Sequence, residues 1–412
     1  MGLGGGITAE EAGLRATLAP SLNRHPEFTE AEIRQRWERA RHLMRREGIN
    51  ALLITGEFNY RYLTGHWSGR ASFRSRPMFL LLPRNGEPCL VITSVEVDQA
   101  RTTAWVPDIR YIVAPRGSND YMGPAVDLVI RALGEQGLDR GRIGCELGVQ
   151  QRIGMPVEEF QRLMATLGKA SFVDASALLW ELRTVKSDAE IGYVRRSAAV
   201  TSGAYRRCLR AVRPGMTERD LFRSLAIAML EQGADSPGYI PVNADIRLPV
   251  PAGATDRRIS AGAVVHVDAG CIIRGYWSDF SRAVAVGEVP TLYRRGYAIL
   301  RTVMHDCIAT LRPGIPLRSI PAYFQTALEK EGYWERGVGR MGHGIGLEQP
   351  EPPSLDFAND GTTTCGMVLC IEPRLVFEDG SRLVLEEEVL ITDGGYALLS
   401  EPCAPELPVA GD

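Results

Sequence analysis

The sequence predicts a two-domain protein in which a small α/β domain precedes a larger α+β domain with an internal pseudo-twofold repeat. Three observations lead to this prediction. The chain has 412 residues, which is long for a single hydrophobic core. Strand-like and helical stretches alternate up to about residue 179, as in an α/β domain. Beyond that point, one pattern of residues occurs twice at a fixed spacing.

The first domain begins with a strong helix signal. Thr29 and Glu32 form a capping-box pattern, apolar residues then recur at helical spacing, and Gly48 ends the run. Residues 51–55 (ALLIT) predict a buried strand, and residues 78–83 and 89–93 predict a hairpin that turns at Asn85-Gly86. We expect a glycine-containing N-terminal arm at residues 1–28 and the domain itself at residues 29–181.

The second domain contains the repeat. An Arg-Arg pair, a cysteine, an Arg-Pro-Gly triplet and a final glycine occur between Arg195 and Gly233, and again 99 residues later between Arg294 and Gly332. Each copy predicts a helix, a break and a second helix, because proline cannot continue a helix and glycine accepts the turn. The polar stretch LRTVKSDA at 182–189 precedes the first copy, so we place this domain at residues 182–412.

Composition and charge exclude several classes of protein. The net charge of −3 provides no general attraction for nucleic acid or for an anionic membrane. No apolar run approaches the roughly 18–20 residues that cross a bilayer, and the first residues lack the pattern of a secretory signal. The eight scattered cysteines form no CxxC pair and predict reduced, mostly buried thiols. We therefore expect a cytoplasmic protein.

Acidic residues and one histidine end strand-like runs in the second domain. Asp268 ends an apolar run, Asp279 follows 11 residues later, His343 lies in a glycine-rich segment, Glu372 follows an apolar run and Glu386 precedes another. A carboxylate at the end of a buried strand is costly unless it is paired or coordinated. Taken singly, each acid also fits a solvated turn. Taken together, they predict a metal site.

The ligand types indicate which metals this site would hold. Carboxylates with one imidazole suit Mn, Fe, Co or Zn better than a soft metal. Two such ions, about 3.5–4 Å apart, can share a bridging hydroxide that attacks a substrate near neutral pH.

Several segments resemble the creatinase, prolidase and aminopeptidase P family, the pita-bread metallohydrolases. In the second domain these are VDAGCIIRGYWSDFSR at 267–282, MGHGIGLEQPEPP at 341–353, CIEP at 370–373 and LEEEVLIT at 385–392. LRTVKSDAEI at 182–191 is similar to the segment that opens the family's catalytic domain, and GEFNYRYLTG at 56–65 is similar to a motif of its creatinase-type N-terminal domain. The likeness covers nearly the whole chain.

The resemblance implies a fold, a cofactor and an activity. It implies a pita-bread catalytic domain after a creatinase-type N-terminal domain, and a homodimer. Its metal ligands fall on Asp268, Asp279, His343, Glu372 and Glu386 of this sequence, with Glu372 and His343 as catalytic candidates. It implies a dinuclear hydrolase that cleaves the C–N bond of an Xaa-Pro dipeptide or another small amide, with manganese among the candidate metals.

The chain departs from the peptidase members at two substrate-site histidines. Where these enzymes carry a second histidine after HGIG, this chain has Pro350, and the segment 243–251 (NADIRLPVP) lacks the histidine that usually precedes the first aspartate. General acid–base groups contribute about 10²–10⁴-fold in rate. A peptidase that lacks both histidines needs a substitute, for which Tyr239, Asp245 and Arg247 are the candidates.

Other side chains have two readings each. Arg374 stands where the family usually has glycine, and it either grips a substrate carboxylate or pairs with Glu387 or Glu388. His66 and Arg74 belong to a basic and aromatic cluster that either binds an acidic or cationic substrate group at a dimer interface, or is solvated or paired with the partner subunit. His266, two residues before Asp268, either supports the metal site or is structural.

Three functions remain open from the sequence. The retained ligands favour a dimetal hydrolase. The missing histidines favour a diverged member, resembling dimethylsulfoniopropionate lyase or creatinase. A binding module without catalysis is the third reading, and the complete ligand set argues against it.

Overall fold

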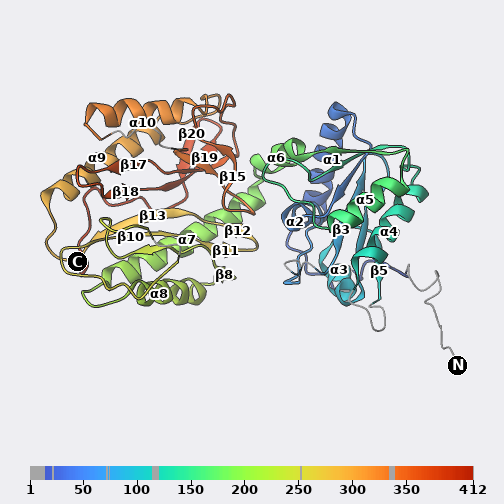
Figure 1. Ribbon diagram of the computed structural model, residues 1–412, viewed down its shortest axis with the longest axis horizontal. Coiled ribbons are helices and arrows are strands. Elements are labelled where there is room, and N and C mark those ends of the chain that lie inside the picture. Colours follow the sequence, from blue (N-terminus) through green and yellow to red (C-terminus); the bar gives the residue numbers. More distant parts are fainter. Residues whose placement is uncertain are drawn as a thin grey trace. The chain divides into compact units, whose positions relative to one another are not determined.

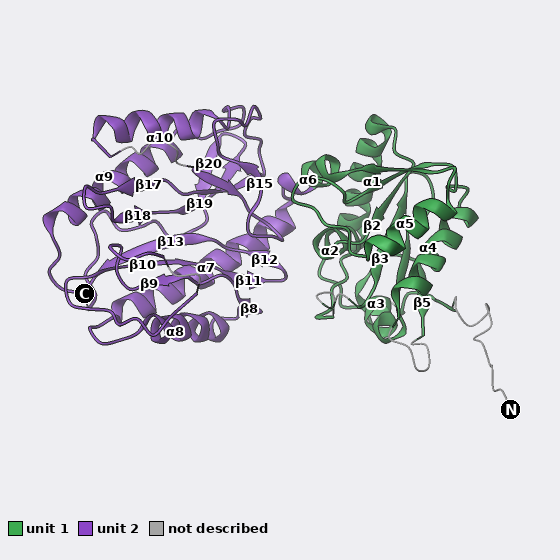
Figure 2. Cartoon of the chain, viewed as in Figure 1, with its two compact units in different colours: residues 1–182 green, residues 183–412 purple. Residues whose placement is uncertain are grey.

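Two units make up the chain, residues 1–182 and 183–412, and the division falls within helix α6 (Ser176–Thr184) (Figure 2). The computed structural model describes residues 14–20, 23–70, 73, 75–113, 120–250, 253–333 and 339–411. Figure 1 labels the main elements of both units.

A mixed seven-stranded sheet forms the centre of the N-terminal unit, in the order β1-β5-β4-β3-β2-β6-β7. β4 and β5 are parallel, as are β2, β6 and β7, whereas β1–β5, β3–β4 and β2–β3 are antiparallel. The strands are β1 (Leu14–Ala16), β2 (Ala51–Ile54), β3 (Met78–Pro83), β4 (Cys89–Thr93), β5 (Asp108–Ile112), β6 (Arg142–Cys145) and β7 (Ser171–Asp174).

Helices cover this sheet, and the first of them confirms the sequence prediction. Oγ1 of Thr29 accepts a hydrogen bond from the Glu32 amide at 3.2 Å, and Gly48 ends the helix with a φ of 67°. The predicted hairpin of β3 and β4 also forms, with Gly86 at a φ of 112°. The helices are α1 (Glu30–Glu47), α2 (Glu57–Thr64), the 3₁₀ helix η2 (Ser94–Glu96), α3 (Val97–Thr103), α4 (Met122–Glu135) and α5 (Val157–Thr166).

The C-terminal unit contains the two predicted helix pairs. The first pair is α7 (Asp188–Arg210) and α8 (Glu218–Glu231), and the second is α9 (Thr291–Ile308) and α10 (Ser319–Lys330). Gly215 and Gly314 lie in the two breaks with φ values of 89° and 85°, a backbone conformation that glycine adopts without strain. In Figure 1, α8 and α10 lie at opposite edges of this unit with strands between them. The internal repeat of the sequence is therefore a repeat of structure.

Short antiparallel strands accompany each helix pair. Two three-stranded sheets, β13-β10-β9 and β12-β11-β8, follow the first pair, and a five-stranded sheet, β15-β14-β16-β19-β20, and the β17–β18 ribbon follow the second. The earlier strands are β8 (Ser236–Pro237), β9 (Val242–Asn243), β10 (Val264–Ala269), β11 (Cys271–Ile273), β12 (Tyr276–Trp277) and β13 (Phe280–Ala285). The later strands are β14 (Gly342–Gly344), β15 (Glu351–Ser354), β16 (Val368–Ile371), β17 (Arg374–Val376), β18 (Arg382–Val384), β19 (Glu387–Thr392) and β20 (Gly395–Leu398).

The cysteines agree with the prediction of reduced thiols. All eight lie in the described part of the chain and are free, and seven of them are buried, with Cys365 exposed. Among the helices of the described ranges, none is both long and apolar enough to cross a bilayer.

Candidate metal centre

Five side chains that lie on or next to five strands meet in the C-terminal unit. Asp268 lies on β10, and Asp279 directly precedes the neighbouring strand β13. His343 lies on β14, Glu372 directly follows β16, and Glu386 directly precedes β19. Because β14, β16 and β19 are neighbours in one sheet and β10 and β13 in another, two sheets supply the cluster.

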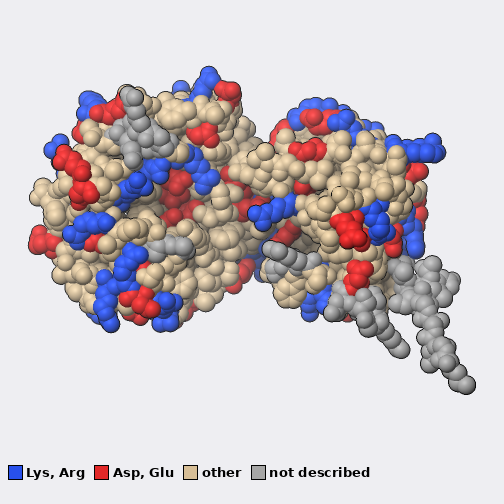
Figure 3. All heavy atoms as spheres, viewed as in Figure 1, with Lys and Arg blue, Asp and Glu red and all other residues tan. Residues whose placement is uncertain are grey.

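The imidazole lies among the carboxylates. Nε2 of His343 is 3.4 Å from Oδ2 of Asp279, 3.9 Å from Oε1 of Glu372 and 4.0 Å from Oε1 of Glu386. The carboxyl group of Asp268 interacts with those of Asp279 and Glu386. The structure thus brings together all five residues of the predicted ligand set. Figure 3 shows acidic atoms within a hollow of this unit, bordered by Lys and Arg side chains.

Glycines on both sides of His343 allow this approach. Gly342 has a φ of 149°, and a Cβ there would lie 2.2 Å from the carbonyl oxygen of Cys370 on β16. A Cβ on Gly344 would lie 2.4 Å from the carbonyl oxygen of Pro352. Only glycine therefore lets β14 pack this closely between its neighbours. Nδ1 of His343 lies 2.9 Å from the Gly344 carbonyl oxygen, which fits an Nδ1–H donor and leaves Nε2 free to face the acids.

The cluster gathers four carboxyl groups, and among the described residues only His343 and Arg340 are basic partners of these acids. Burial, followed by the charges of Asp279 and Glu372, holds the pKa of Asp268 well above its usual range. Burial, followed by the charges of Asp279 and Asp268, does the same to the pKa of Glu386. Oδ1 of Asp268 and Oε1 of Glu386 are buried without a hydrogen-bond partner among the described residues. Divalent cations would coordinate these oxygens and relieve the repulsion, so the donor set fits the expected metal.

The neighbouring carboxylates also affect the protonation of His343. Burial opposes the charged imidazole, but the hydrogen bond and charge of Asp279 outweigh it and raise the pKa of His343. Nε2 faces three carboxylates, which is the position of a metal ligand rather than of a buried core histidine.

Four neighbours of the cluster escape prediction from the sequence. Nε2 of Gln349 donates to Oδ2 of Asp279 at 2.5 Å, and Nε of Arg340 lies 3.5 Å from Oε1 of Glu372. Two further residues contact the backbone of Asp279. The Cys370 thiol donates to its carbonyl oxygen at 3.3 Å, and Oε2 of Glu388 accepts from its amide at 3.2 Å. Cys370 is directly opposite His343 in the strand register, which only the structure shows.

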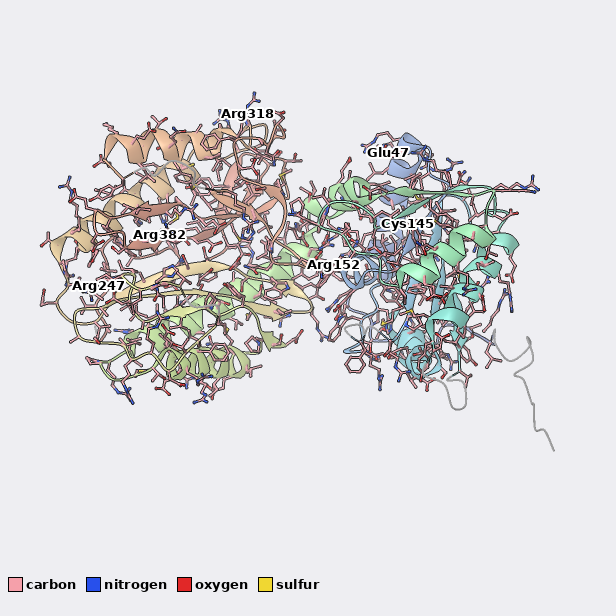
Figure 4. The ribbon with its side chains drawn as sticks, viewed as in Figure 1. Glu47, Cys145, Arg152, Arg247, Arg318 and Arg382 are labelled. Carbon is pink, nitrogen blue, oxygen red and sulfur yellow. The ribbon has the colours of Figure 1, made fainter. Side chains whose placement is uncertain are left out.

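The predicted substrate residues of this unit differ in their surroundings. Tyr239 is 45% exposed, and partial burial and the charges of Asp268 and Asp279 raise the pKa of its phenol, so it lies close to the acids. Asp245 and Arg247 bind each other, with Nε of Arg247 at 3.0 and 2.9 Å from the two carboxylate oxygens. Arg247, labelled in Figure 4, is therefore already paired.

The remaining candidates make fewer contacts or lie in the other unit. Nε of Arg374 is buried without a hydrogen-bond partner among the described residues. The His266 imidazole has the same property at Nε2, and burial lowers its pKa to about 4. His66, in the N-terminal unit, is fully buried with Nδ1 at 2.7 Å from Oγ1 of Thr103, so the structure gives it a packing position. Arg74 falls outside the described residues.

Comparisons with known proteins match both units. The model of metallopeptidase family M24 matches residues 192–393, and that of the creatinase/prolidase N-terminal domain matches residues 36–185. The chain is 28% identical over 365 residues to the probable dipeptidase PepE of Mycobacterium tuberculosis, which covers 88% of this chain and 92% of that protein. It is 26% identical over 366 residues to the uncharacterized peptidase YqhT of Bacillus subtilis, covering 87% and 95%.

A solved structure shares the fold. The Xaa-Pro dipeptidase from Bacillus anthracis superposes with a TM-score of 0.78 at 24% identity, over 92% of this chain and 99% of that one.

Proposed function

Because the chain belongs to metallopeptidase family M24 and carries a creatinase/prolidase N-terminal domain, we propose that it hydrolyses the C–N bond of a small peptide or amide with two divalent metal ions. The chain is a metal-dependent hydrolase of the pita-bread fold. We propose that the site holds two ions, that these ions are Mn, Co, Fe or Zn, and that the substrate is an Xaa-Pro dipeptide.

One observation carries the proposal. Three carboxylates face the imidazole of His343, Asp268 adds a fourth acid to the cluster, and one buried oxygen each of Asp268 and Glu386 has no hydrogen-bond partner among the described residues. A cluster of this charge is stable only when its acids are protonated or when cations coordinate them. Four carboxylates balance the charge of two divalent ions, so the ligand set of Asp268, Asp279, His343, Glu372 and Glu386 suits a dinuclear site.

The bound ions would polarise the scissile carbonyl and acidify the attacking water. A substrate can reach Glu372, since its side chain is 24% exposed whereas those of Asp279 and Glu386 are 3% and 2% exposed. We assign to Glu372 the transfer of a proton from water to the leaving nitrogen. His343 holds its place through the Nδ1 contact with Gly344, which keeps Nε2 directed at the reacting centre.

The missing histidines leave room for another polar group beside the centre. Gln349 occupies the position before Pro350 and reaches Asp279 with its side-chain amide. A neutral donor there can hold a substrate oxygen, although it cannot carry a proton as histidine does. Tyr239 lies close to the same acids and supplies a hydroxyl. These two side chains are the substitutes that we propose.

The hypotheses of a lyase-like or creatinase-like enzyme are less favoured than that of a hydrolase. The relatives that match over most of the chain bear names of peptidases and dipeptidases, and none of those reported bears the name of a lyase or a creatinase. We extend the proposal to a cytoplasmic homodimer, which rests on the free thiols and on the family resemblance.

Metal analysis combined with a substrate panel tests the proposal. The purified protein, loaded in turn with Mn, Co or Zn, is assayed on Xaa-Pro dipeptides, other dipeptides, simple amides and sulfonium acids. We expect about two ions per chain and hydrolysis within the peptide and amide group. Asp279→Asn should lose metal and activity, whereas Asp360→Asn, at a side chain that is 83% exposed, should lose neither. A protein that binds no metal and turns over nothing would contradict the proposal, and elimination from a sulfonium acid would favour the lyase.

A further inference from the structure

Arg374 is a partly buried cation that pairs with no acid in the part of the chain that the structure describes. Its Nε is buried and has no hydrogen-bond partner, and within the described ranges its guanidinium forms no hydrogen bond or ion pair with the protein. Taking a charge out of water without a partner is costly. Such a group is stable next to the metal centre only if water or a ligand satisfies it.

The two acids that the sequence offered as partners are engaged elsewhere. Glu387 accepts from Arg282 at 2.8 Å and from the Cys403 amide at 2.7 Å. Glu388 accepts from the Asp279 amide at 3.2 Å. The structural reading of Arg374, as half of an ion pair with Glu387 or Glu388, is therefore not the one that this fold adopts.

Strand geometry directs Arg374 toward the metal ligands. It lies two residues after Glu372, and in the β17–β18 register it is directly opposite Val384, which lies two residues before Glu386. The amide of Leu385 donates to the carbonyl oxygen of the intervening Pro373 at 3.4 Å, which continues the ladder toward both acids. Side chains two residues apart, or directly opposite across a ladder, point to the same face. Arg374 thus shares a face with Glu372 and Glu386.

Burial along the strand supports this orientation. Leu375 and Phe377 are buried in the hydrophobic core, whereas Glu372, Arg374 and Val376 are half-buried. This alternation has the period of an extended strand with one face on the core and the other on an open space. The guanidinium therefore lies on the side of the strand from which a substrate reaches Glu372.

Charge decides what Arg374 would bind. In the proposed dinuclear site, the four carboxylates of the ligand set bind the two divalent ions, so no acid of the set is left to pair with the guanidinium. Its planar fork matches a carboxylate through two parallel hydrogen bonds. We infer that Arg374 is a specificity-determining residue that binds a carboxylate of the substrate, so that the enzyme selects amides with a carboxylate close to the scissile bond. This inference rests on the proposed function for the reaction, and on Arg374 alone for the selectivity.

Binding of a matched pair of probes tests the inference without turnover. Acetylglycine and acetylglycinamide differ only in the carboxylate, and calorimetry on the metal-loaded protein gives the dissociation constant of each. We expect the acid to bind about tenfold more tightly than the amide to the unaltered protein. Arg374→Gln should reduce this preference to within about twofold, and Arg374→Lys should restore part of it. Equal affinities in the unaltered protein, or a preference that survives Arg374→Gln, would overturn the inference.

Two controls complete the experiment. Arg318→Gln removes an arginine of the same unit whose side chain is 61% exposed (labelled in Figure 4), and it should keep the full preference. Metal content and melting temperature are measured for every variant, and Arg374→Lys provides the comparison at retained charge if Arg374→Gln is unstable.

Hydrolysis of the two probes and of the dipeptide panel separates this inference from the proposed function. Turnover without a carboxylate preference would overturn the role of Arg374 but would still support the proposed hydrolase function. A preference that depends on Arg374, in a protein without turnover, would support the carboxylate site and contradict the hydrolase.

Discussion

The side-chain amide of Gln349 lies 2.5 Å from Oδ2 of Asp279, so a neutral donor reaches the carboxylate that is 3.4 Å from His343. This contact joins two segments that are 70 residues apart in the sequence. It places Gln349 beside the candidate metal ligands, directly before Pro350.

Replacing Gln349 should impair catalysis more than metal binding. Gln349→Ala removes one hydrogen bond to a charged group, which corresponds to about 1.5–3 kcal/mol, so kcat/KM should fall about tenfold or more. Metal content should stay the same, because the five candidate ligands are unchanged. Steady-state kinetics and metal analysis check this, with Gln325→Ala on the exposed side of α10 as the control. An unchanged kcat/KM would show that Gln349 has no role in catalysis.

Removing one acid of the cluster should stabilise the metal-free protein. The charges of Asp279 and Asp268 destabilise ionised Glu386, so Glu386→Gln relieves repulsion when no cation is present. We expect the melting temperature in EDTA to rise by about 2 °C or more. The rise that metal produces in the unaltered protein should shrink in the variant, because a ligand is lost. As a control, Glu378→Gln, at an exposed acid, should change neither the melting temperature in EDTA nor the rise that metal produces. A lower melting temperature of Glu386→Gln than of the unaltered protein in EDTA would contradict the charge argument.

A buried ion cluster should make the C-terminal unit sensitive to the loss of Glu351. Its Oε2 lies 3.1 Å from Nζ of Lys186, and Oε1 accepts from Arg183 and from the Glu348 amide. Glu351→Gln would remove the carboxylate that pairs with Lys186 and leave Arg183 with Glu348 alone, and breaking a buried pair costs about 3–5 kcal/mol. Urea unfolding at neutral pH measures this loss, and a cost below about 1 kcal/mol would show that solvent screens the cluster.

The same cluster predicts a dependence on pH. Burial opposes ionisation of Glu351, but Arg183 and Lys186 outweigh it and lower its pKa from 4.5 to about 2. Because the folded pKa is the lower one, ionised Glu351 adds stability above pH 4.5, and this stability is lost as the pH falls toward 2. The difference in unfolding free energy between the unaltered protein and Glu351→Gln should therefore narrow below pH 4.5. A difference that is constant with pH would contradict the prediction.

The N-terminal unit should lose stability in a different pH range. Burial, followed by the charge of Arg61, lowers the pKa of His66 from 6.5 to about 4. Since the unfolded chain takes up the proton first, stability is highest above pH 6.5 and declines by about 3 kcal/mol as the pH falls to 4. Urea unfolding of the N-terminal unit at several pH values measures this decline. His66→Gln should reduce this decline in unfolding free energy, whereas His42→Gln, on the exposed side of α1, should leave the decline unchanged.

Local signals account for the elements that the sequence predicted well. Thr29 and Gly48 bound α1 because capping depends on a few neighbouring residues. The two Arg-Pro-Gly breaks end helices in both copies of the repeat for the same reason. The predicted fold class is confirmed, with a creatinase-type N-terminal domain before a pita-bread domain.

Contacts between distant segments could not be read from the sequence. Leu14–Ala16, within the expected arm of residues 1–28, form β1 and pair with β5, about a hundred residues away. Gln349 and Arg340 reach the acids only after the sheets have formed. The absence of an acid beside Arg374 among the described residues likewise depends on tertiary packing.

The five candidate ligands are divided between the two copies of the repeat. Asp268 and Asp279 follow the first helix pair, and His343, Glu372 and Glu386 follow the second. Neither copy alone would hold a dinuclear centre, so ions bound there would bridge the copies as a cross-link does. Chelation should then loosen one half of the unit against the other, and a fragment ending before α9 should have little affinity for metal however well it folds.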